Sequence, residues 1–294
     1  MRPHHRLAAA LALATLTAAA HADDRLKPFV LASRATGDVE ASVAAAKQKL
    51  AAAGLEVAGS YSPYEGAVVL AVTSPALREA AAKSRFGGYA AAQRVAVTRV
   101  GDEIQTTYTN PVYMQHAYRM AGDLAPVAQA LEAALGRVEE YGPDEGRRPK
   151  DLRGYHYMVS MPYFDEPWKL ASFETHRAAV EAVASGLAHE QGGTRLVYRI
   201  DVPGAEETVF GVGLSAGCGG DEHVMKEIDF KPLRSTGHLP YEVLVSGKDV
   251  YALHAKFRIA VNFPDLKMMG SHSFMNIRCA PDDIEAALGK VVGR

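Results

Sequence analysis

The order of apolar and polar residues divides most of the chain into short strands and amphipathic helices. Apolar residues spaced three or four apart are typical of a helix with one buried face, whereas alternating or short continuous apolar runs are typical of strands. Pro75 fits the first turn of a helix, and Gly101-Asp102 is typical of a hairpin turn. In the first part of the chain this pattern predicts strands at 29–34, 56–60, 68–72, 95–100 and 104–109, and helices at 39–53, 75–83 and 124–135.

The second part of the chain repeats this order of elements with longer connections. The closing helices of the two parts share the string Glu-Ala-Ala-Leu-Gly, at 132–136 and at 285–289. The shared order and the shared string together indicate a tandem duplication. In the second part the pattern predicts strands at 155–163, 196–201, 208–214, 243–245 and 250–261, and helices at 176–190 and 282–292.

The segment 139–154 is charged, contains Gly and Pro, and is poor in apolar residues, as is typical of a domain boundary. We therefore expect a first domain at 23–138, a linker at 139–154 and a second domain at 155–294. The predicted fold class is α+β, with two similar tandem domains that each consist of a mainly antiparallel sheet and the helices packed on it.

The first 22 residues have the pattern of a secretory signal peptide. A short basic start is followed by an apolar run of about 14 residues and by the small-x-small sequence Ala20-His21-Ala22. The run is too short to span roughly 30 Å of hydrocarbon as a helix. The pattern predicts cleavage after Ala22, no transmembrane segment in the mature chain, and a periplasmic or secreted location.

Charge and cysteine content narrow the chemistry further. The chain has 32 basic and 34 acidic side chains and a formal net charge of −2, so it lacks the basic excess of a nucleic-acid-binding protein. Cys218 and Cys279 are its two cysteines. In an oxidising compartment they would form one disulfide, and the alternative is two buried free thiols.

Short motifs occur in the first part at 54–57 (GLEV), 68–77 (VVLAVTSPAL) and 110–114 (NPVYM), and in the second part at 238–247 (HLPYEVLVSG) and 262–268 (NFPDLKM). These motifs resemble the domain of unknown function 302 family, those of the second part more loosely. The resemblance implies a compact α+β fold for each copy, the second more divergent than the first, and it implies almost nothing about chemistry.

Methionine and histidine occur together along the chain, and the eight methionines of the predicted mature chain all have a histidine nearby in sequence. Thioether and imidazole ligands suit copper better than hard cations. Two groups follow Pro-containing segments and share a Met-to-Met spacing of six, so we expect them at equivalent places in the two domains. The alternative, which the apolar neighbours favour, is that methionine fills the core. The candidate metal ligands are Met114, His116, Met120, Met268, Met269, His272 and Met275.

Ser215 lies in the sequence Gly-Leu-Ser-Ala-Gly, which matches the G-x-S-x-G nucleophile elbow. It predicts a serine hydrolase with Asp229, Asp249 or Asp265 as the acid and His238, His254 or His272 as the base. Against this, Cys218-Gly219-Gly220 follows where an elbow needs a helix to begin. A Gly-rich turn is therefore the favoured interpretation.

The acidic cluster at 221–229 is expected to be a solvated helix face, and the alternative is a hard-metal or acid/base site. Taken together, these patterns favour an exported, non-enzymatic binding or accessory protein that handles a metal such as copper, haem or a small ligand. The alternatives are a hydrolase that uses Ser215 and a module that docks another exported protein. The aromatic residues Tyr155, Tyr157 and Trp168 favour a sheet surface covered by a helix, and the alternative is that they line a ligand cleft between the domains.

Overall fold

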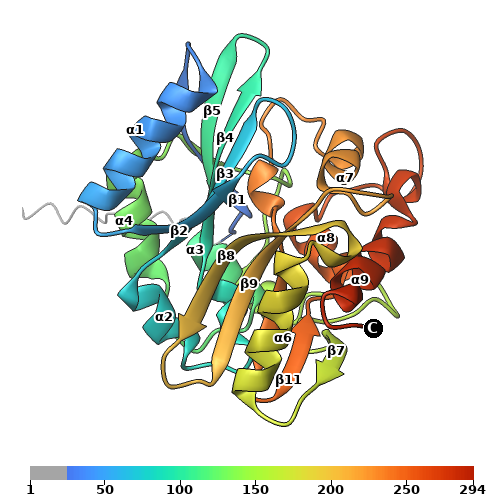
Figure 1. The fold of residues 1–294 in the computed structure, drawn as a ribbon. Helices are drawn as coiled ribbons and strands as arrows, with labels where there is room; N and C mark the ends of the chain where they lie inside the picture. Colours follow the sequence, from blue (N-terminus) through green and yellow to red (C-terminus); the bar gives the residue numbers. More distant parts are fainter. Residues whose placement is uncertain (1–24) are drawn as a thin grey trace, which may run out of the picture.

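The structure, a computed structural model, describes residues 25–294, so the predicted signal peptide lies outside the described residues. Two antiparallel sheets carry helices packed on them, which confirms the α+β fold class (Figure 1). The first sheet has six strands in the order β2-β3-β4-β5-β1-β6. Their bounds are β1 (Phe29–Ala35), β2 (Glu56–Tyr61), β3 (Ala67–Thr73), β4 (Gln93–Val100), β5 (Glu103–Thr109) and β6 (Glu139–Tyr141).

The second sheet has five strands in the order β7-β11-β10-β9-β8. Below, the first half denotes β1 to β6 with their connections, and the second half denotes β7 to the C-terminal helix. The strands are β7 (Trp168–Ser172), β8 (Thr194–Val202), β9 (Glu207–Leu214), β10 (Tyr241–Ser246) and β11 (Asp249–Ala252).

Nine α-helices lie within residues 25–294, together with short 3-10 turns. The helices are α1 (Val39–Ala52), α2 (Pro75–Ala81), α3 (Pro111–Ala117), α4 (Ala125–Leu135), α5 (Pro149–Arg153), α6 (His176–Ala188), α7 (Asp221–Ile228), α8 (Ala255–Asn262) and α9 (Ala280–Lys290). The 3-10 turns are η1 (Gly87–Ala90), η2 (Gln191–Gly193), η3 (Thr236–His238) and η4 (Phe274–Ile277).

Local sequence fixes where several of these helices begin. Asp38, Ser74, Asn110 and Thr175 are N-caps whose side-chain oxygens accept hydrogen bonds from backbone amides two or three residues later. These bonds satisfy amide groups that the first turn of a helix leaves without a partner. The predicted starts of the helices at 39, 75 and 176 are confirmed.

The two halves repeat one topology. Strand, helix, two strands, helix, 3-10 turn, two strands and two helices follow one another in both halves, and the five repeated strands take the same order in each sheet. The irregularities repeat as well, because β2 bulges between Val57 and Gly59 and β8 bulges between Leu196 and Tyr198. The sheet order and the matching bulges agree with the duplication expected from the sequence.

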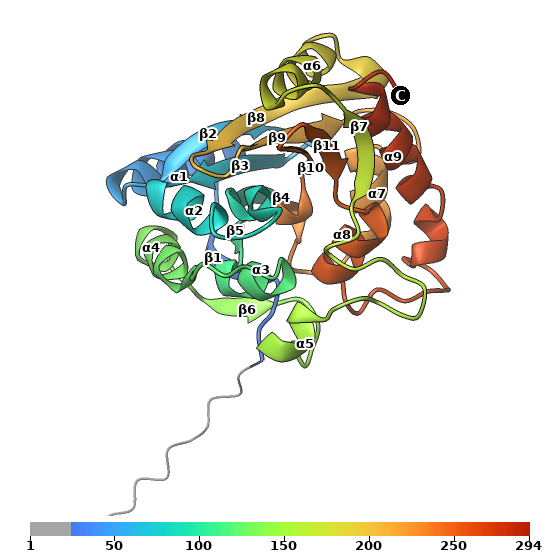
Figure 2. The same cartoon turned by 90° about the horizontal axis from the view of Figure 1, so that it is seen from below.

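The two halves interlock through these equivalent elements. The turn η1 of the first half packs on β8, β9 and β10, and the turn η3 of the second half packs on β3, β4 and β5. Figure 2 shows β2 and β8 side by side where the two sheets meet. A Cβ atom at Gly59 would lie 2.0 Å from the carbonyl oxygen of Val197, so this close crossing requires glycine.

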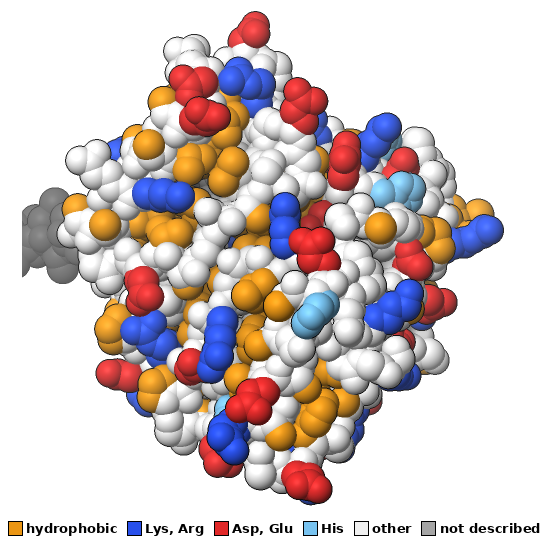
Figure 3. All heavy atoms as spheres, in the orientation of Figure 1, with side chains coloured by type: hydrophobic (Ala, Val, Ile, Leu, Met, Phe, Trp, Pro, Cys, Tyr) orange, Lys and Arg blue, Asp and Glu red, His pale blue; other side chains and the backbone are white. Residues whose placement is uncertain are grey.

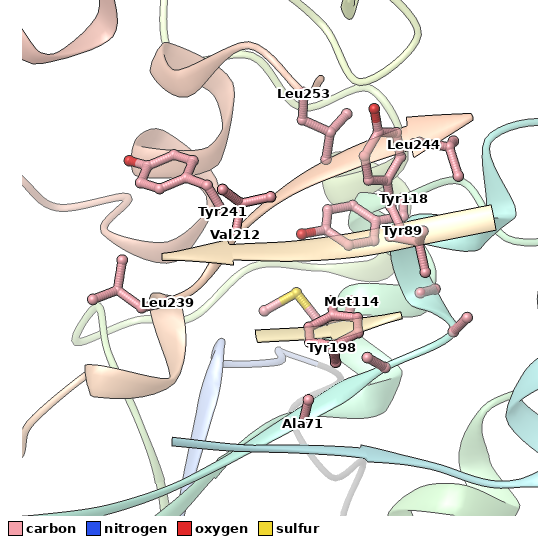
Figure 4. Packing of buried hydrophobic residues seen from close by; sticks show 14 of the residues in the cluster. Ala71, Tyr89, Met114, Tyr118, Tyr198, Val212, Leu239, Tyr241, Leu244 and Leu253 are labelled. Carbon is pink, nitrogen blue, oxygen red and sulfur yellow. The ribbon is translucent and has the colours of Figure 1, made fainter. Parts of the chain in front are cut away.

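The interlocked halves bury a single apolar core around a cluster of charges. Buried hydrophobic residues of both halves form one continuous cluster, part of which Figure 4 shows with Tyr89 and Tyr198 labelled. Within it, Arg94 of β4 forms an ion pair of 2.5 Å with Glu242 of β10, and Arg258 of α8 binds the same carboxylate at 2.8 Å. Buried charges persist only when they are paired, so this cluster fixes how the halves meet.

Three sequence-based expectations are wrong in detail. Residues 155–163 form turns rather than a strand, and the strand that occupies this place in the topology is β7. The strand expected at 250–261 ends at Ala252, and α8 follows it with His254 as N-cap. Segment 139–154 is not a plain linker, because it contains β6, paired with β1, and the short helix α5.

On the face drawn in Figure 3, acidic and basic side chains alternate over both halves and neither sign forms a continuous patch. Within residues 25–294, no helix combines the length and apolar character needed to cross a membrane.

Candidate functional site

An apolar hollow lies where the two halves meet, at the C-terminal end of α7. This interhalf groove has a volume of about 530 Å³. The end of β6 and the segment after it form one wall, while the second half forms the others. Its volume is within the range of small-molecule sites, roughly 300–1,000 Å³. Its apolar lining is Tyr141, Ile228, Phe230, Leu233, Phe263 and Leu266.

Asp229 places a buried carboxyl group against this lining. The residue is 6% exposed and caps the C-terminal end of α7. Its Oδ1 atom accepts a hydrogen bond of 2.8 Å from the amide of Ser235, whereas Oδ2 has no hydrogen-bond partner. Burial raises the pKa of Asp229 to about 7, although the Ser235 amide and the charge of Arg234 act in the opposite direction.

The rim of the groove is polar and carries two lysines. Lys231 donates to the carbonyl oxygen of Gly142 at 3.3 Å and forms an ion pair with Asp265. Lys267 also lines the groove, and it has no carboxylate within ion-pair distance in the described part of the chain. The rim can therefore bind one acidic group while the floor binds an apolar body.

An exposed aromatic ring lies at the edge of the groove. Phe230 is 45% exposed, and its ring stacks on that of His272 with centroids 4.4 Å apart. Nδ1 of His272 donates a hydrogen bond of 3.0 Å to the carbonyl oxygen of Glu227, which fixes the imidazole ring in place. An exposed phenylalanine beside an apolar groove offers ready contact area for a flat ligand.

The expectation that the acidic cluster at 221–229 is a solvated helix face is wrong at both ends. Asp221 and Asp229 are buried, and each lines a hollow between the halves, while Glu222 and His223 between them are exposed. The amphipathic spacing of Val224, Met225 and Ile228 does give α7 a buried face, as the sequence pattern requires. The sequence carried no signal of which acidic residues would face inward.

Ser215 does not occupy a nucleophile elbow. Its hydroxyl donates a hydrogen bond of 2.9 Å to the carbonyl oxygen of Gly193, and α7 begins six residues later at Asp221. The motif glycines have local explanations. A Cβ at Gly213 would lie 3.0 Å from the Tyr61 ring, and Gly217 has a φ of +71°, which favours glycine.

The acids and bases predicted to act with Ser215 lie elsewhere. In residues 25–294 no hydrogen bond links Ser215 to Asp229, Asp249, Asp265, His238, His254 or His272. His238 is fully buried beside Tyr241, and burial holds its pKa well below the usual range. Burial also lowers the pKa of His254 to about 4.

The first Met/His group belongs to the core of the first half. Met114 and Met120 are buried in the apolar cluster at α3 and just beyond it. His116 is half-buried, and burial together with the charge of Arg153 lowers its pKa. Met114 and Met120 therefore fill space in the core, which is the alternative that the sequence favoured.

The second Met/His group lies in the surface segment after α8. Met269 is 77% exposed, and Met275 is also exposed. The expected equivalence of the two groups is wrong, because α3 corresponds to α8, and Met114 therefore corresponds to Arg258. Met268 instead lines a small cavity together with Met161.

Metal binding by these methionines stays a prediction. Among the described residues, no group of three or more His, Cys, Asp or Glu side chains is placed to hold a metal ion.

The structure contains a disulfide between Cys218 and Cys279, whose Cα atoms lie 6.0 Å apart. It ties the connection between β9 and α7 to the residue that precedes α9. Beside it, the amide of Gly219 donates a hydrogen bond of 3.0 Å to Asp283. The disulfide therefore anchors the loop that leads into α7.

Sequence reasoning missed the residues with the most unusual surroundings. Arg94, Glu242 and Arg258 were not singled out, although Glu242 interrupts an otherwise apolar strand. A single acidic residue inside a buried strand is the one sequence signal here, because a buried charge needs a partner of opposite charge. The partner itself lies in the other half and could not be identified from local sequence.

A comparison with protein-family models finds no match, and searches of curated proteins and of solved structures find no significantly similar protein. The resemblance of the two halves to the domain of unknown function 302 family stays a prediction that rests on the short motifs.

Proposed function

We propose that this protein is an exported, non-enzymatic binding protein that holds a small, largely apolar acid in the interhalf groove. The observation that carries this proposal is the groove itself, which joins an apolar floor, contributed by both halves, to a rim with Lys267. Export is supported by the signal-peptide pattern of residues 1–22 and by the Cys218–Cys279 disulfide, since disulfides persist in oxidising compartments.

Each part of the groove would bind a different part of the ligand. Burial of apolar surface contributes about 25 cal/mol per Å², so contact with Phe230, Phe263 and Leu266 would supply most of the affinity. The ammonium group of Lys267 would pair with the acid of the ligand at the rim. The carboxyl group of Asp229, which lines the groove, would orient a polar group of the ligand at the floor.

The proposal is tested with anilinonaphthalene sulfonate, a fluorescent apolar anion, and with octanoate and benzoate as competitors. We expect saturable fluorescence with the folded protein and displacement by at least one of the two carboxylates. Replacement Phe230→Ala removes the exposed ring and should weaken binding of the dye about tenfold. Lys267→Gln should weaken the carboxylates more than an uncharged apolar competitor such as octanol.

Leu196→Ala is the matched control, because Leu196 is also 45% exposed and lies on β8, away from the groove. It should leave dye binding within about twofold of wild type. Equal binding by wild type, Phe230→Ala and Leu196→Ala, or no displacement by either carboxylate, would overturn the proposal.

A further inference from the structure

A second hollow lies at the opposite end of α7 and differs in chemistry from the groove. This polar pocket has a volume of about 660 Å³. Residues 61–63 of the first half form one wall, and the ends of β8 and β9 with the start of α7 form the others. Because these lining residues come from both halves, the pocket lies at the junction of the halves.

Asp221 forms the floor of the polar pocket and has one unsatisfied oxygen. The residue is 2% exposed. Its Oδ2 atom accepts hydrogen bonds from the amide of Leu214 at 3.0 Å and from the hydroxyl of Tyr61 at 3.1 Å, while Oδ1 has no partner. The two donors on Oδ2 fix the orientation of the carboxyl group. Burying a carboxyl oxygen without a partner is costly, so a ligand donor that reaches this carboxyl group would offset the cost.

Two sources of positive potential face the same pocket. Gly220 is the N-cap of α7 and has no side chain to cap the helix, so the first-turn amides are left to bind an acceptor. The guanidinium group of Arg195 lies 5.6 Å from the centroid of the Tyr61 ring and donates to the carbonyl oxygen of Ser62 at 3.3 Å. Tyr61 therefore contacts both Arg195 and Asp221.

The remaining charged groups of the lining have both signs. Lys226 adds a cation, whereas Glu190 and Glu222 add carboxylates at the exposed rim. A simple anion would be repelled by the acidic side chains. A simple cation would face Arg195, Lys226 and the positive end of α7. A ligand that carries both charges, held apart by a short spacer, satisfies both sets of groups.

We propose that the polar pocket binds a small zwitterion, such as a free α-amino acid. Its carboxylate lies at the N-terminus of α7 beside Arg195, and its ammonium group lies against the carboxyl group of Asp221. The hydroxyl of Ser215, which lines the pocket and donates to Gly193, accepts a second hydrogen bond from the ammonium group. This site shares no lining residue with the interhalf groove, so the two sites can be tested separately.

The test screens the standard α-amino acids by thermal shift with the full mature chain and measures the strongest by titration calorimetry. Acetate, methylamine and inorganic phosphate, which lack the pair of charges, serve as comparison ligands. We expect at least one α-amino acid to bind and to bind at least ten times more tightly than any of the three. No binding by any amino acid, or equally tight binding by phosphate or methylamine, would overturn the proposal.

Two variants assign the binding to this pocket. Asp221→Asn keeps an acceptor for Leu214 and Tyr61 but removes the negative charge, so affinity for the amino acid should fall at least tenfold. Arg195→Gln changes an exposed side chain and should cause a similar fall while leaving the thermal midpoint close to wild type. Arg195→Gln therefore keeps the test decisive if Asp221→Asn does not fold.

Asp102→Asn, an exposed change in the turn between β4 and β5, is the matched control and should bind like wild type. Wild-type affinity in both pocket variants would contradict the assignment. Dye binding in the interhalf groove, measured on the same variants, should not change, so the outcome is independent of the test of that groove.

Discussion

Two aspartates at the ends of one helix show how much the surroundings of a residue change its chemistry. Asp221 and Asp229 flank α7, and each has one carboxyl oxygen without a hydrogen-bond partner. Burial raises the pKa of both to about 7, against partial opposition from hydrogen-bond donors and nearby arginines. Near neutral pH each carboxyl group can therefore take up or release a proton, which exposed aspartates do not do.

Asp229 should make the protein less stable as pH rises through neutrality. The pKa of Asp229 changes from 3.8, the ordinary value, to about 7 on folding, so the folded state holds the proton more tightly. Its stabilising contribution is complete below pH 4 and is lost as pH rises to about 7. Asp229→Asn should reduce the fall in unfolding free energy between pH 5 and 8 by on the order of 2 kcal/mol, since each pKa unit corresponds to about 1.4 kcal/mol.

Urea unfolding at pH 5, 6, 7 and 8 measures this slope. Asp102→Asn, the exposed control, should keep the slope of wild type. An unchanged slope in Asp229→Asn would mean that the carboxyl group is not protonated more readily in the folded state.

At the scale of elements, the connection between β9 and α7 positions both hollows. It leaves the sheet after Leu214, and the Cys218–Cys279 disulfide fixes it to the start of α9. A buried stripe of Val224, Met225 and Ile228 then holds α7 against the core. The start of the helix depends on a cross-link, whereas its body depends on ordinary apolar packing.

Removing the disulfide should destabilise the whole protein. The two cysteines are 61 residues apart, and closing a loop of this length restricts the unfolded chain by about 4 kcal/mol in the loop-entropy description. The double variant Cys218→Ser and Cys279→Ser should lose about this much unfolding free energy, measured by urea unfolding without reductant. Dithiothreitol should bring wild type to the same value and leave the variant unchanged. Equal stability of wild type and variant would contradict this account.

At the scale of the whole molecule, one carboxylate joins the two halves. Glu242 accepts hydrogen bonds from Tyr198 at 2.5 Å and from Arg258 at 2.8 Å, and it pairs with Arg94 of the other half. Around it, η1 and η3 are each packed on the sheet of the opposite half. The halves therefore share one core, and neither buries its charges alone.

Glu242→Gln should be strongly destabilising because it leaves Arg94 and Arg258 buried without a negative partner. Breaking a buried ion pair in this way costs about 3–5 kcal/mol. Glu56→Gln removes the surface pair with Arg78, whose distance is 3.2 Å, and should cost less than about 1 kcal/mol. Guanidinium unfolding of the two variants makes the comparison. Similar small losses in both would show that the buried cluster does not hold the halves together.

The chain by itself determined the features that depend on neighbours in sequence. Ser74 and Asp38 cap their helices with their own side chains, and Gly101-Asp102 turns β4 into β5. The repeated order of elements likewise follows from local apolar periodicity, so the α+β class and the duplicated plan could be predicted. The cysteine count left two options, of which the structure contains the disulfide.

Only the tertiary structure decided which polar residues are buried and what they contact. Asp221 and Glu222 are adjacent, yet one forms the floor of a pocket and the other is exposed. Arg94 and Glu242 are far apart in sequence and meet only because the two sheets cross. Strand β7 lies at Trp168–Ser172 and not at the predicted 155–163, because pairing with β11 rather than local propensity defines it. Burial and pairing depend on distant parts of the chain, and periodicity reports only on neighbours.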